Sequence, residues 1–388
     1  MNSTPYFSVL IPTKNRSHLV AYAIRSVLNQ TFADFEIVVA DNDDSSTSTW
    51  DVVKAFQDSR VRYFRSGGLN MSENWEFALD HARGDYVTVL EDKHAYYPWA
   101  LERMNSLIAA TGCKVVTWQW DIYRDRKRLA YRDKHSRSAK VMTAEEILGR
   151  YVSNPAAEWR CLPLMVKSCA SHDVIRQIRQ HPAVRRFFDE TSPDVCAAAL
   201  LLGYVDRCCI LDDGLGLGGY VHESNLLKWA VQKGAGSYYG GSEQALLEAS
   251  VRFVPIKSPR LVQNVVYNDF LKIRQAIGGR LSAFKMEPLV YAKLCARDIA
   301  YNTVRGGSSP GEWRWIHDFV SAAELGKTHA WFSIGAYLFG EVLKWVGMKL
   351  RPAFPSTYGK VWHADEIVEA AMTLGNEASM PDVLLPNQ

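Results

Sequence analysis

Short apolar runs alternate with longer amphipathic segments along the first hundred residues. The apolar runs have the length of strands, and the segments between them carry apolar residues at helical spacing. The predicted strands are Tyr6–Ile11, Phe35–Ala40, Val61–Phe64 and Tyr86–Leu90. The predicted helices are Ser17–Gln30, Thr47–Gln57 and Ser72–Ala82. This alternation predicts an α/β fold with a mainly parallel, Rossmann-like sheet flanked by helices.

Polar side chains follow three of these strands directly. They occupy Pro12–Arg16, Asp41–Ser46 and Glu91–His94. Because the carboxyl ends of parallel strands share one edge of a sheet, we expect these groups to meet there around a ligand. Taken alone, Asp41–Ser46 also fits a turn followed by a helix N-cap. Four ionisable groups at Glu91–His94 are costly at the end of a buried strand unless a charged ligand docks there.

Further elements extend this pattern toward the C-terminus. A helix at Trp99–Ala110 and strands at Lys114–Tyr123 and Tyr204–Leu211 are predicted, and helical patterns then dominate, as in Val262–Ile277 and Pro288–Val304. We therefore expect one α/β domain over residues 1–222, with halves at about 1–112 and 113–222. Residues 223–388 are expected to form a mostly helical domain or extension.

Composition narrows the classes of partner. The 388 residues are 47% hydrophobic and carry a net charge of +3, which gives no indication of a nucleic-acid partner. Seven scattered cysteines without a C-x-x-C pair fit reduced, buried thiols. The N-terminus has no basic segment followed by an apolar run. A cytoplasmic protein is expected, with a place at the inner face of the membrane as an alternative.

Four stretches of the first hundred residues resemble a known family in their order and spacing. They are Phe7–Arg16 (FSVLIPTKNR), Ser26–Thr31 (SVLNQT), Glu36–Asn42 (EIVVADN) and Ala82–Val87 (ARGDYV). Together they resemble the opening of family-2 glycosyltransferases, which have the GT-A fold. The resemblance implies an inverting enzyme that transfers a sugar from a nucleotide diphosphate to a hydroxyl of a glycan or lipid-linked acceptor. Bacterial surface-polysaccharide synthesis is the implied setting.

The resemblance also implies a donor site. The residues carried over to it are Pro12, Thr13, Arg16, Asp41, Asp43, Asn70, Asn74, Glu91 and Asp92. Asp41 would accept a hydrogen bond from the imide N–H of uracil or thymine, which favours a UDP- or dTDP-sugar. For the stretch that contains Asn70 and Asn74, an alternative is structural: Ser72 would cap a helix whose Trp75 and Leu79 lie in the core.

One motif departs from the family pattern. Members usually have a run of aspartates where this chain reads Leu90-Glu91-Asp92-Lys93-His94, and counting back from Pro98 puts Lys93 in the place of the main metal ligand. A protonated lysine cannot bind a metal, but it can neutralise a diphosphate leaving group. We therefore expect metal-independent transfer. In the competing interpretation, Asp92, with Glu91 or His94, still holds Mg²⁺ or Mn²⁺.

Two later segments resemble the acceptor side and the closing segment of the family. Asp194 would be the catalytic base, chosen over Asp189 and Glu190, although capping of a helix with Ser192 as N-cap and Pro193 in its first turn also explains it. His222 matches a histidine near the diphosphate, and a surface or core histidine is the alternative. The glycines of Asp212–His222 are expected to form a flexible loop.

Two other segments leave their roles open. The basic run between Arg124 and Lys140 fits a solvated loop or a site for a phosphate-bearing acceptor. The apolar segment Trp331–Val346 contains Glu341 and Lys344, and it is too short and too charged for a confident transmembrane prediction. A core helix or a contact between copies in a homo-oligomer is expected for it, with a peripheral membrane helix as the alternative.

Two other functions compete with glycosyl transfer. The altered metal motif also fits a sugar-nucleotide-binding protein that has lost catalysis. A nucleotidyltransferase would need a Gly-rich phosphate loop near the first strand, and Pro12–Arg16 lacks glycine.

Overall fold

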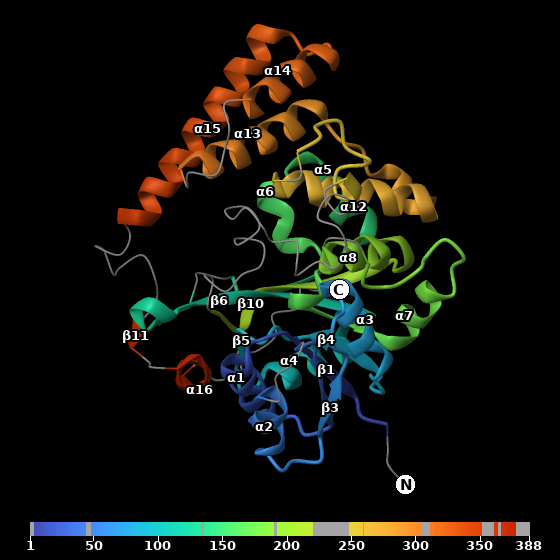
Figure 1. Ribbon diagram of the computed structural model, residues 1–388, viewed down its shortest axis with the longest axis vertical. Coiled ribbons are helices and arrows are strands. Elements are labelled where there is room, and N and C mark those ends of the chain that lie inside the picture. The colour runs from blue at the N-terminus through green and yellow to red at the C-terminus, as the bar shows by residue number, and fades with distance from the viewer. Residues whose placement is uncertain are drawn as a thin grey trace.

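A computed structural model of the chain describes residues 4–43, 48–132, 136–189, 192–219, 248–258, 260–304, 311–350, 361–363 and 366–377. Within this part, eleven strands form one sheet with helices on both faces (Figure 1). The predicted α/β class is confirmed.

The first four long strands pair in parallel. They are β1 (Phe7–Thr13), β2 (Phe35–Asp41), β3 (Val61–Arg65) and β4 (Tyr86–Val89), in the spatial order β4-β1-β2-β3. The register puts Thr13 beside Asp41, so that the polar ends of β1 and β2 are level. The predicted parallel arrangement therefore holds where the candidate site begins.

The second half of the sheet is mixed. Its strands are β5 (His94–Tyr96), β6 (Val115–Arg124), β7 (Leu129–Tyr131), β8 (Ala139–Thr143), β9 (Ser168–Ser171), β10 (Arg207–Gly218) and β11 (Val361–His363). β9 runs antiparallel between β4 and β6, β10 is parallel to β6, and the remaining pairs are antiparallel.

Helices cover both faces of the sheet because its strands are apolar on both sides. Along β1, Val9 and Ile11 join one core with α1 (Ser17–Leu28), α4 (Ala100–Thr111) and α16 (Ile367–Glu377). Leu10, which points to the opposite side, joins a core with α3 (Met71–Asp80), α5 (Ala144–Ser153), α7 (His172–Arg179) and α8 (Pro193–Tyr204). The shorter helices α2 (Ser48–Lys54) and α6 (Pro155–Glu158) lie at the edges.

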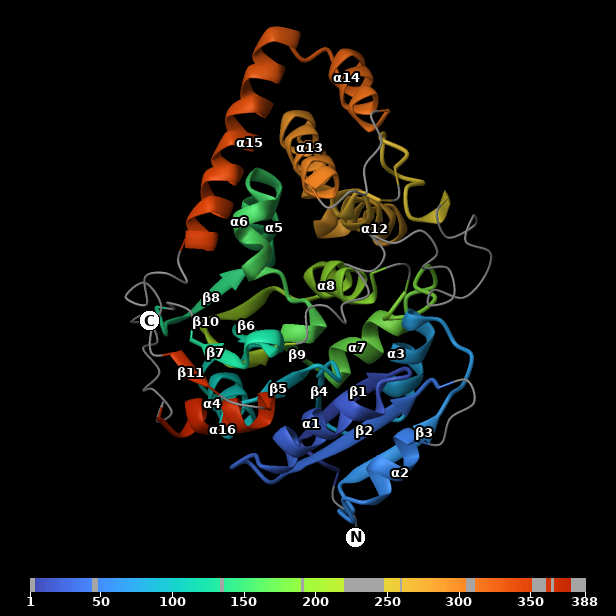
Figure 2. The same ribbon diagram turned by 60° about the vertical axis from the view of Figure 1, so that its left-hand side comes forward.

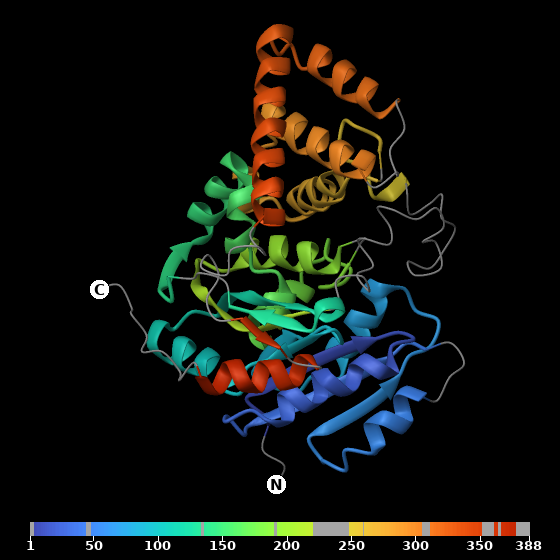
Figure 3. The ribbon, with the colours of Figure 1, turned by 90° about the vertical axis from the view of Figure 1, so that its left-hand side faces the viewer.

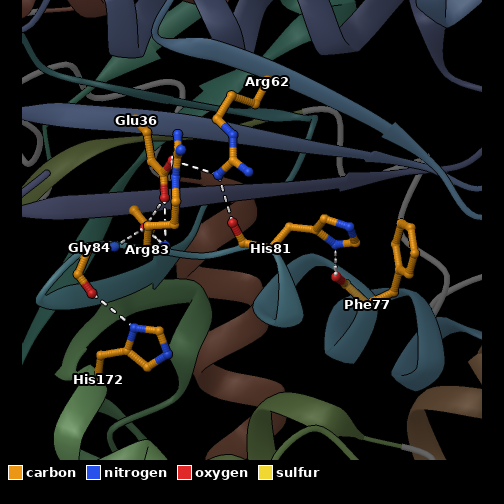
Figure 4. A network of polar contacts seen from close by, with 8 residues as sticks. Glu36, Arg62, Phe77, His81, Arg83, Gly84 and His172 are labelled. Carbon is orange, nitrogen blue, oxygen red and sulfur yellow. Dashed lines mark hydrogen bonds and ion pairs between the residues drawn. The ribbon is translucent and has the colours of Figure 1, made fainter. Parts of the chain in front are cut away.

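The segment Ala82–Val87, part of the family resemblance, has a structural role. The buried carboxylate of Glu36 accepts hydrogen bonds from Ser8 Oγ (2.7 Å), Arg62 Nη1 (2.7 Å) and the backbone N–H of Arg83 (2.7 Å), as Figure 4 shows in part. The N–H of Gly84 donates to Ser8 Oγ (2.8 Å). A Cβ at Gly84 would lie 2.6 Å from Ser8 N. These contacts fasten the start of β4 to β1 and β2.

The glycine-rich segment after Leu211 is not the loop that the sequence predicts. Asp212–Gly218 continues β10, and its pairing with β6 shifts register around Gly214. A Cβ at Gly214 would collide with the carboxylate of Asp121, and a Cβ at Gly216 with the backbone oxygen of Ala95. The glycines therefore permit close packing within a bulged strand. α8 also extends through Tyr204, where the sequence predicts a strand.

A helical unit stands beyond α8 on one side of the sheet (Figures 1 and 3). Its helices are α12 (Val262–Ile277), α13 (Pro288–Val304), α14 (Glu312–Ala322) and α15 (Lys327–Leu350). The bounds of α12 and α13 are those predicted from the sequence. In the described part of the chain, no helix has the length and hydrophobicity required to span a bilayer.

The chain then returns to the sheet. β11 pairs with β7, and α16 packs beside α1 and β5 (Figure 2). Trp99 Nε1 donates to the oxygen of Gly375 (2.9 Å), and Arg25 forms an ion pair with Glu366 (3.2 Å). Residues 361–363 and 366–377 thus contact the α/β domain, although the sequence predicts a helical region for all of 223–388.

Candidate functional site

Thr13 of β1 and Arg16, the N-cap residue of α1, hold Asp92 at the carboxyl edge of the sheet. Thr13 Oγ1 donates to Asp92 Oδ2 (2.8 Å), and Arg16 Nη1 donates to Asp92 Oδ1 (3.1 Å). All three residues are buried. Burial raises the pKa of Asp92, whereas Arg16 and Thr13 act to lower it. The neighbouring Pro12 is buried at the end of β1.

Asp41, at the end of β2, is fully buried. Its carboxylate accepts from the hydroxyl of Tyr63 (2.6 Å) and from the backbone N–H of Asp43 (2.9 Å). Asp43 accepts from the N–H of Asn15 and from Thr49 Oγ1 (3.0 Å). The candidate contacts to the base and the ribose therefore lie together, each already held in place by its own backbone and side-chain donors.

Asn70 and Asn74 shape the adjoining loop. Asn70, rather than the predicted Ser72, caps α3, and it forms a capping box with Glu73. Asn74 Nδ2 donates to the oxygen of Ala40 (3.1 Å), and its Oδ1 accepts from Ser66 Oγ (2.8 Å). Trp75 and Leu79 lie in the core, as the structural alternative predicts.

Asn42 completes this loop. Its side-chain amide donates to the oxygen of Leu69 (2.6 Å), and its Oδ1 accepts from the N–H of Leu69 (2.9 Å). Both hydrogen bonds tie the stretch before α3 to the end of β2. The rim is thus one connected hydrogen-bonded structure.

The turn after β4 contains a partly buried ion pair. Lys93 Nζ lies 2.9 Å from Glu91 Oε1, and His94 Nε2 lies 3.6 Å from Glu91 Oε2. Burial would raise the pKa of Glu91, but the charges of Lys93, His94 and Arg16 lower it to about 2. Burial lowers the pKa of His94 to about 4, so this imidazole is neutral near pH 7. Its ring packs on Trp120, with centroids 4.8 Å apart.

The donor set at this turn does not fit a divalent cation. Both oxygens of Asp92 are engaged by Thr13 and Arg16, and Glu91 is paired with the ammonium of Lys93. Mg²⁺ and Mn²⁺ require oxygen ligands free of competing cations. Within the described ranges, no group of three or more His, Cys, Asp or Glu residues is arranged to hold a metal.

Asp194 interacts electrostatically with this turn although it lies about a hundred residues further along the chain. It occupies the first turn of α8, after Pro193. Burial, with the negative charge of Glu91, raises the pKa of Asp194 to about 6, and Lys93 opposes this shift. The two candidate catalytic residues therefore interact electrostatically. Ser192 occupies the N-cap position as predicted, but its hydroxyl makes no capping hydrogen bond.

The remaining candidates of the acceptor side and the closing segment are Asp189, Glu190 and His222. Asp189 lies 3.7 Å from Lys272 Nζ of α12, in an ion pair. Glu190 and His222 lie outside the described residues.

Two residues that the sequence does not single out belong to the site. Tyr63 holds Asp41, and only its place on the strand next to β2 could indicate this. Lys167 ends the short helix η3 (Met165–Lys167), and its Nζ donates to the oxygens of Arg160 (2.7 Å) and Trp159 (3.2 Å). Burial lowers the pKa of Lys167 to about 7, and Asp194 acts against this. In the sequence, only the position of Lys167 within an apolar run could indicate this role.

The basic run is structured in its described part. Arg132 is buried, with Nη2 2.9 Å from Asp213 Oδ1 and Nε 3.5 Å from Asp121 Oδ2. Arg124 lies over the ring of Tyr131. These two arginines therefore have structural partners, unlike the side chains of a solvated loop. All seven cysteines are buried and unpaired, as predicted.

The parallel strands β1–β4, their antiparallel extension and the polar rim define an α/β protein with its candidate site at the carboxyl ends of the parallel strands. Residues 8–169 match the family described as "Glycosyl transferase family 2". This part of the chain is similar to that family.

Named relatives match part of the chain. One is "GalNAc(5)-diNAcBac-PP-undecaprenol beta-1,3-glucosyltransferase" of Campylobacter jejuni, 39% identical over 104 residues that cover 26% of this chain and 33% of the relative. Another is "UDP-Glc:alpha-D-GlcNAc-diphosphoundecaprenol beta-1,3-glucosyltransferase WfgD" of Escherichia coli, 30% identical over 118 residues that cover 30% of this chain and 46% of the relative. The chain thus spans less than half of their lengths in these matches.

Among solved structures, TarS residues 1–349 of S. aureus is similar, with a TM-score of 0.48 and 15% identity. The similarity covers 82% of this chain and 92% of that one. The same protein has been solved in complex with UDP-GlcNAc (TM-score 0.47, 14% identity, 82% of this chain and 92% of that one).

Proposed function

We propose that this protein is an inverting glycosyltransferase that transfers a sugar from a nucleotide diphosphate to a hydroxyl of a glycan or lipid-linked acceptor. The observation that carries this proposal is the position of Asp194 in the first turn of α8, where it interacts electrostatically with Lys93 and Glu91 of the segment that matches family 2. A carboxylate with a raised pKa and a cation for a leaving diphosphate are the two groups that such a transfer requires.

A UDP-sugar is the proposed donor. The buried carboxylate of Asp41 would accept from the imide N–H of uracil, and Thr13, Arg16 and Asp92 would border the nucleotide. UDP-glucose is the donor in the name of the E. coli relative, and both relatives act on acceptors named as diphosphoundecaprenol-linked sugars. A polyprenyl-diphosphate-linked sugar is accordingly the proposed acceptor, and assembly of a bacterial surface glycan is the proposed setting.

In the proposed reaction, the acceptor oxygen attacks the anomeric carbon from the face opposite the diphosphate. A new C–O bond forms as the bond from that carbon to the phosphate oxygen breaks, and the acceptor proton passes to Asp194. The released diphosphate carries additional negative charge, which Lys93 neutralises. Lys93 exchanges its ion pair with Glu91 for one with the diphosphate in this step.

We further propose that the transfer needs no divalent metal. The engagement of both Asp92 oxygens by Thr13 and Arg16 supports this, because carboxylate oxygens are the ligands that Mg²⁺ prefers. The ammonium of Lys93 lies at the turn where a metal would otherwise support the leaving group.

The full-length chain should release UDP from UDP-glucose when a polyprenyl-diphosphate-linked sugar is supplied, and a chelator should not change the rate. Lys93→Ala should lower kcat by about a hundredfold or more, because one preorganised charge-stabilising group contributes that much. Lys54→Ala, which removes an exposed lysine of α2, is the matched control.

The outcomes separate the hypotheses. Activity that a chelator abolishes and Mn²⁺ restores would contradict metal independence but leave the transferase proposal intact. UDP binding, detected by thermal shift, without turnover of any donor would favour a binding protein. A chain that neither binds a nucleotide nor turns over a nucleotide sugar would overturn the donor site.

A further inference from the structure

The helical unit carries more positive charge than the rest of the chain. Residues 251–350 contain 14 Lys and Arg against 7 Asp and Glu, whereas the net charge of the whole chain is only +3. The remaining residues are therefore net acidic. Exposed cations of this unit include Arg314 on α14 and Lys327 on α15, whereas Lys344 on α15 is paired with Glu341 (2.7 Å). Such an asymmetry favours an anionic partner at this end of the molecule.

One face of α15 is packed and another is apolar but uncovered. Ala330 and Ile334 are each 1% exposed, in the core with α13. Phe332 (77% exposed), Phe339 (65%), Val342 (54%) and Leu343 (55%) form what we call the apolar stripe. Their spacing of seven, three and one residues keeps them on one side of the helix over about 17 Å. α15 lies at the outer edge of the molecule (Figures 1 and 2).

A groove adjoins this stripe. It has a volume of about 280 Å³ and lies between α13 and α15. Tyr301, Val304, Leu338 and Val342 line it, with Arg297 and Glu341 supplying charged groups. Val304 is 76% exposed. The uncovered apolar surface therefore continues from α15 onto α13.

We propose that the apolar stripe and this groove dock onto the surface of a bilayer that contains anionic phospholipids. An exposed apolar helix face within a basic unit is the arrangement by which helices lie in a membrane interface. The four stripe side chains expose roughly 400 Å², if a fully exposed apolar side chain of this size is taken as 150–200 Å². That is about half of the ~800 Å² per partner that a stable protein–protein interface buries. A lipid surface requires no such matching area, so the small area and the positive charge favour it over a second copy.

Vesicle sedimentation of the full-length protein tests this inference without any turnover, so it is independent of the proposed transferase activity. The protein should sediment with vesicles of phosphatidylethanolamine and phosphatidylglycerol, and much less with phosphatidylcholine alone. The double substitution Phe332→Ser with Phe339→Ser should weaken binding about tenfold or more, because it removes most of the aromatic area of the stripe. Its melting temperature should stay unchanged because both rings are exposed.

Two further variants serve as controls. Val141→Ser alters an apolar residue of β8 that is 40% exposed and lies outside the helical unit, and it should not affect binding. Phe339→Leu keeps an apolar side chain and should retain most of the binding. A wild-type protein that does not bind the anionic vesicles would overturn the inference, as would equal binding by the double variant. A dimer in solution that the double variant converts to a monomer would show a contact between copies instead.

Discussion

Glu91 interacts with both residues assigned to the chemistry. It forms the ion pair with Lys93, and its charge raises the pKa of Asp194. A diphosphate that binds Lys93 must therefore compete with this carboxylate. Because Glu91 remains charged down to a pKa of about 2, the competition persists across the physiological pH range. The strength of that competition should influence how readily the diphosphate leaves.

The pH dependence of the reaction should report Asp194. A base must be ionised, so kcat/KM should rise about tenfold per pH unit below about pH 6 and level off above it. Glu91→Gln should move this limb to lower pH, because it removes a negative charge that raises the pKa of Asp194. The profile is measured in the donor-plus-acceptor assay.

Substitutions show which group causes the acid limb of the pH profile. Asp194→Asn should lower kcat by about 10²- to 10⁴-fold and abolish the limb. Asp189→Asn is the matched control, because that carboxylate is paired with Lys272 instead, and its profile should match the wild type. A wild-type limb that persists in Asp194→Asn would assign the titration to another group.

At the scale of single elements, local patterns were sufficient for some predictions and not for others. The amphipathic spacing of Val262–Ile277 predicts α12 correctly because a helix depends on residues three and four apart. The sequence pattern predicts a loop for the glycines of β10 because the groups that require glycine there, such as the carboxylate of Asp121 beside Gly214, lie on other strands. Asn70 was assigned a ligand, whereas its described contacts are those of a helix cap. The rim of strand ends could be predicted because parallel strands bring their ends together.

Gly84 provides a test at this scale. Gly84→Ala should lower the free energy of unfolding by about 2 kcal/mol, because the new methyl group would lie 2.6 Å from Ser8 N in a packed sheet. Gly149→Ala in α5 is the matched control: no atom lies within 4 Å of a Cβ there, and alanine favours a helix by about 1 kcal/mol. Denaturant unfolding measures both. Equal effects of the two substitutions would refute the close-packing argument.

At the scale of the whole molecule, the proposed bilayer-docking face and the proposed lipid-linked acceptor are consistent with each other. A polyprenyl acceptor resides in a membrane, so a face that holds the protein there would limit the search for the acceptor to two dimensions. The sequence could indicate the apolar segment Trp331–Val346 but not which of its sides is covered. Which side of the helix is covered depends on the position of α13, and the periodicity of the sequence does not reveal that position.

The packing of α16 against the α/β domain leads to a prediction about stability. Ile367 is fully buried in the core that includes β1 and α1. Ile367→Ala should therefore lower the free energy of unfolding by about 3 kcal/mol. Thr373→Ala, at an exposed position of the same helix, should change it by less than about 0.5 kcal/mol. If both variants unfold at the same denaturant concentration, α16 does not contribute to that core.

The packing of α16 against the α/β domain also has a consequence for synthesis of the chain. A Cβ at Gly219 would lie 2.6 Å from Ile367 Cδ1 and 3.4 Å from the backbone oxygen of Lys93, so α16 comes close to the turn that carries Lys93. A ribosome translates the residues of the rim first and those of α16 only after the whole helical unit. The nascent α/β domain must therefore wait, with part of its core uncovered, until α16 has left the exit tunnel.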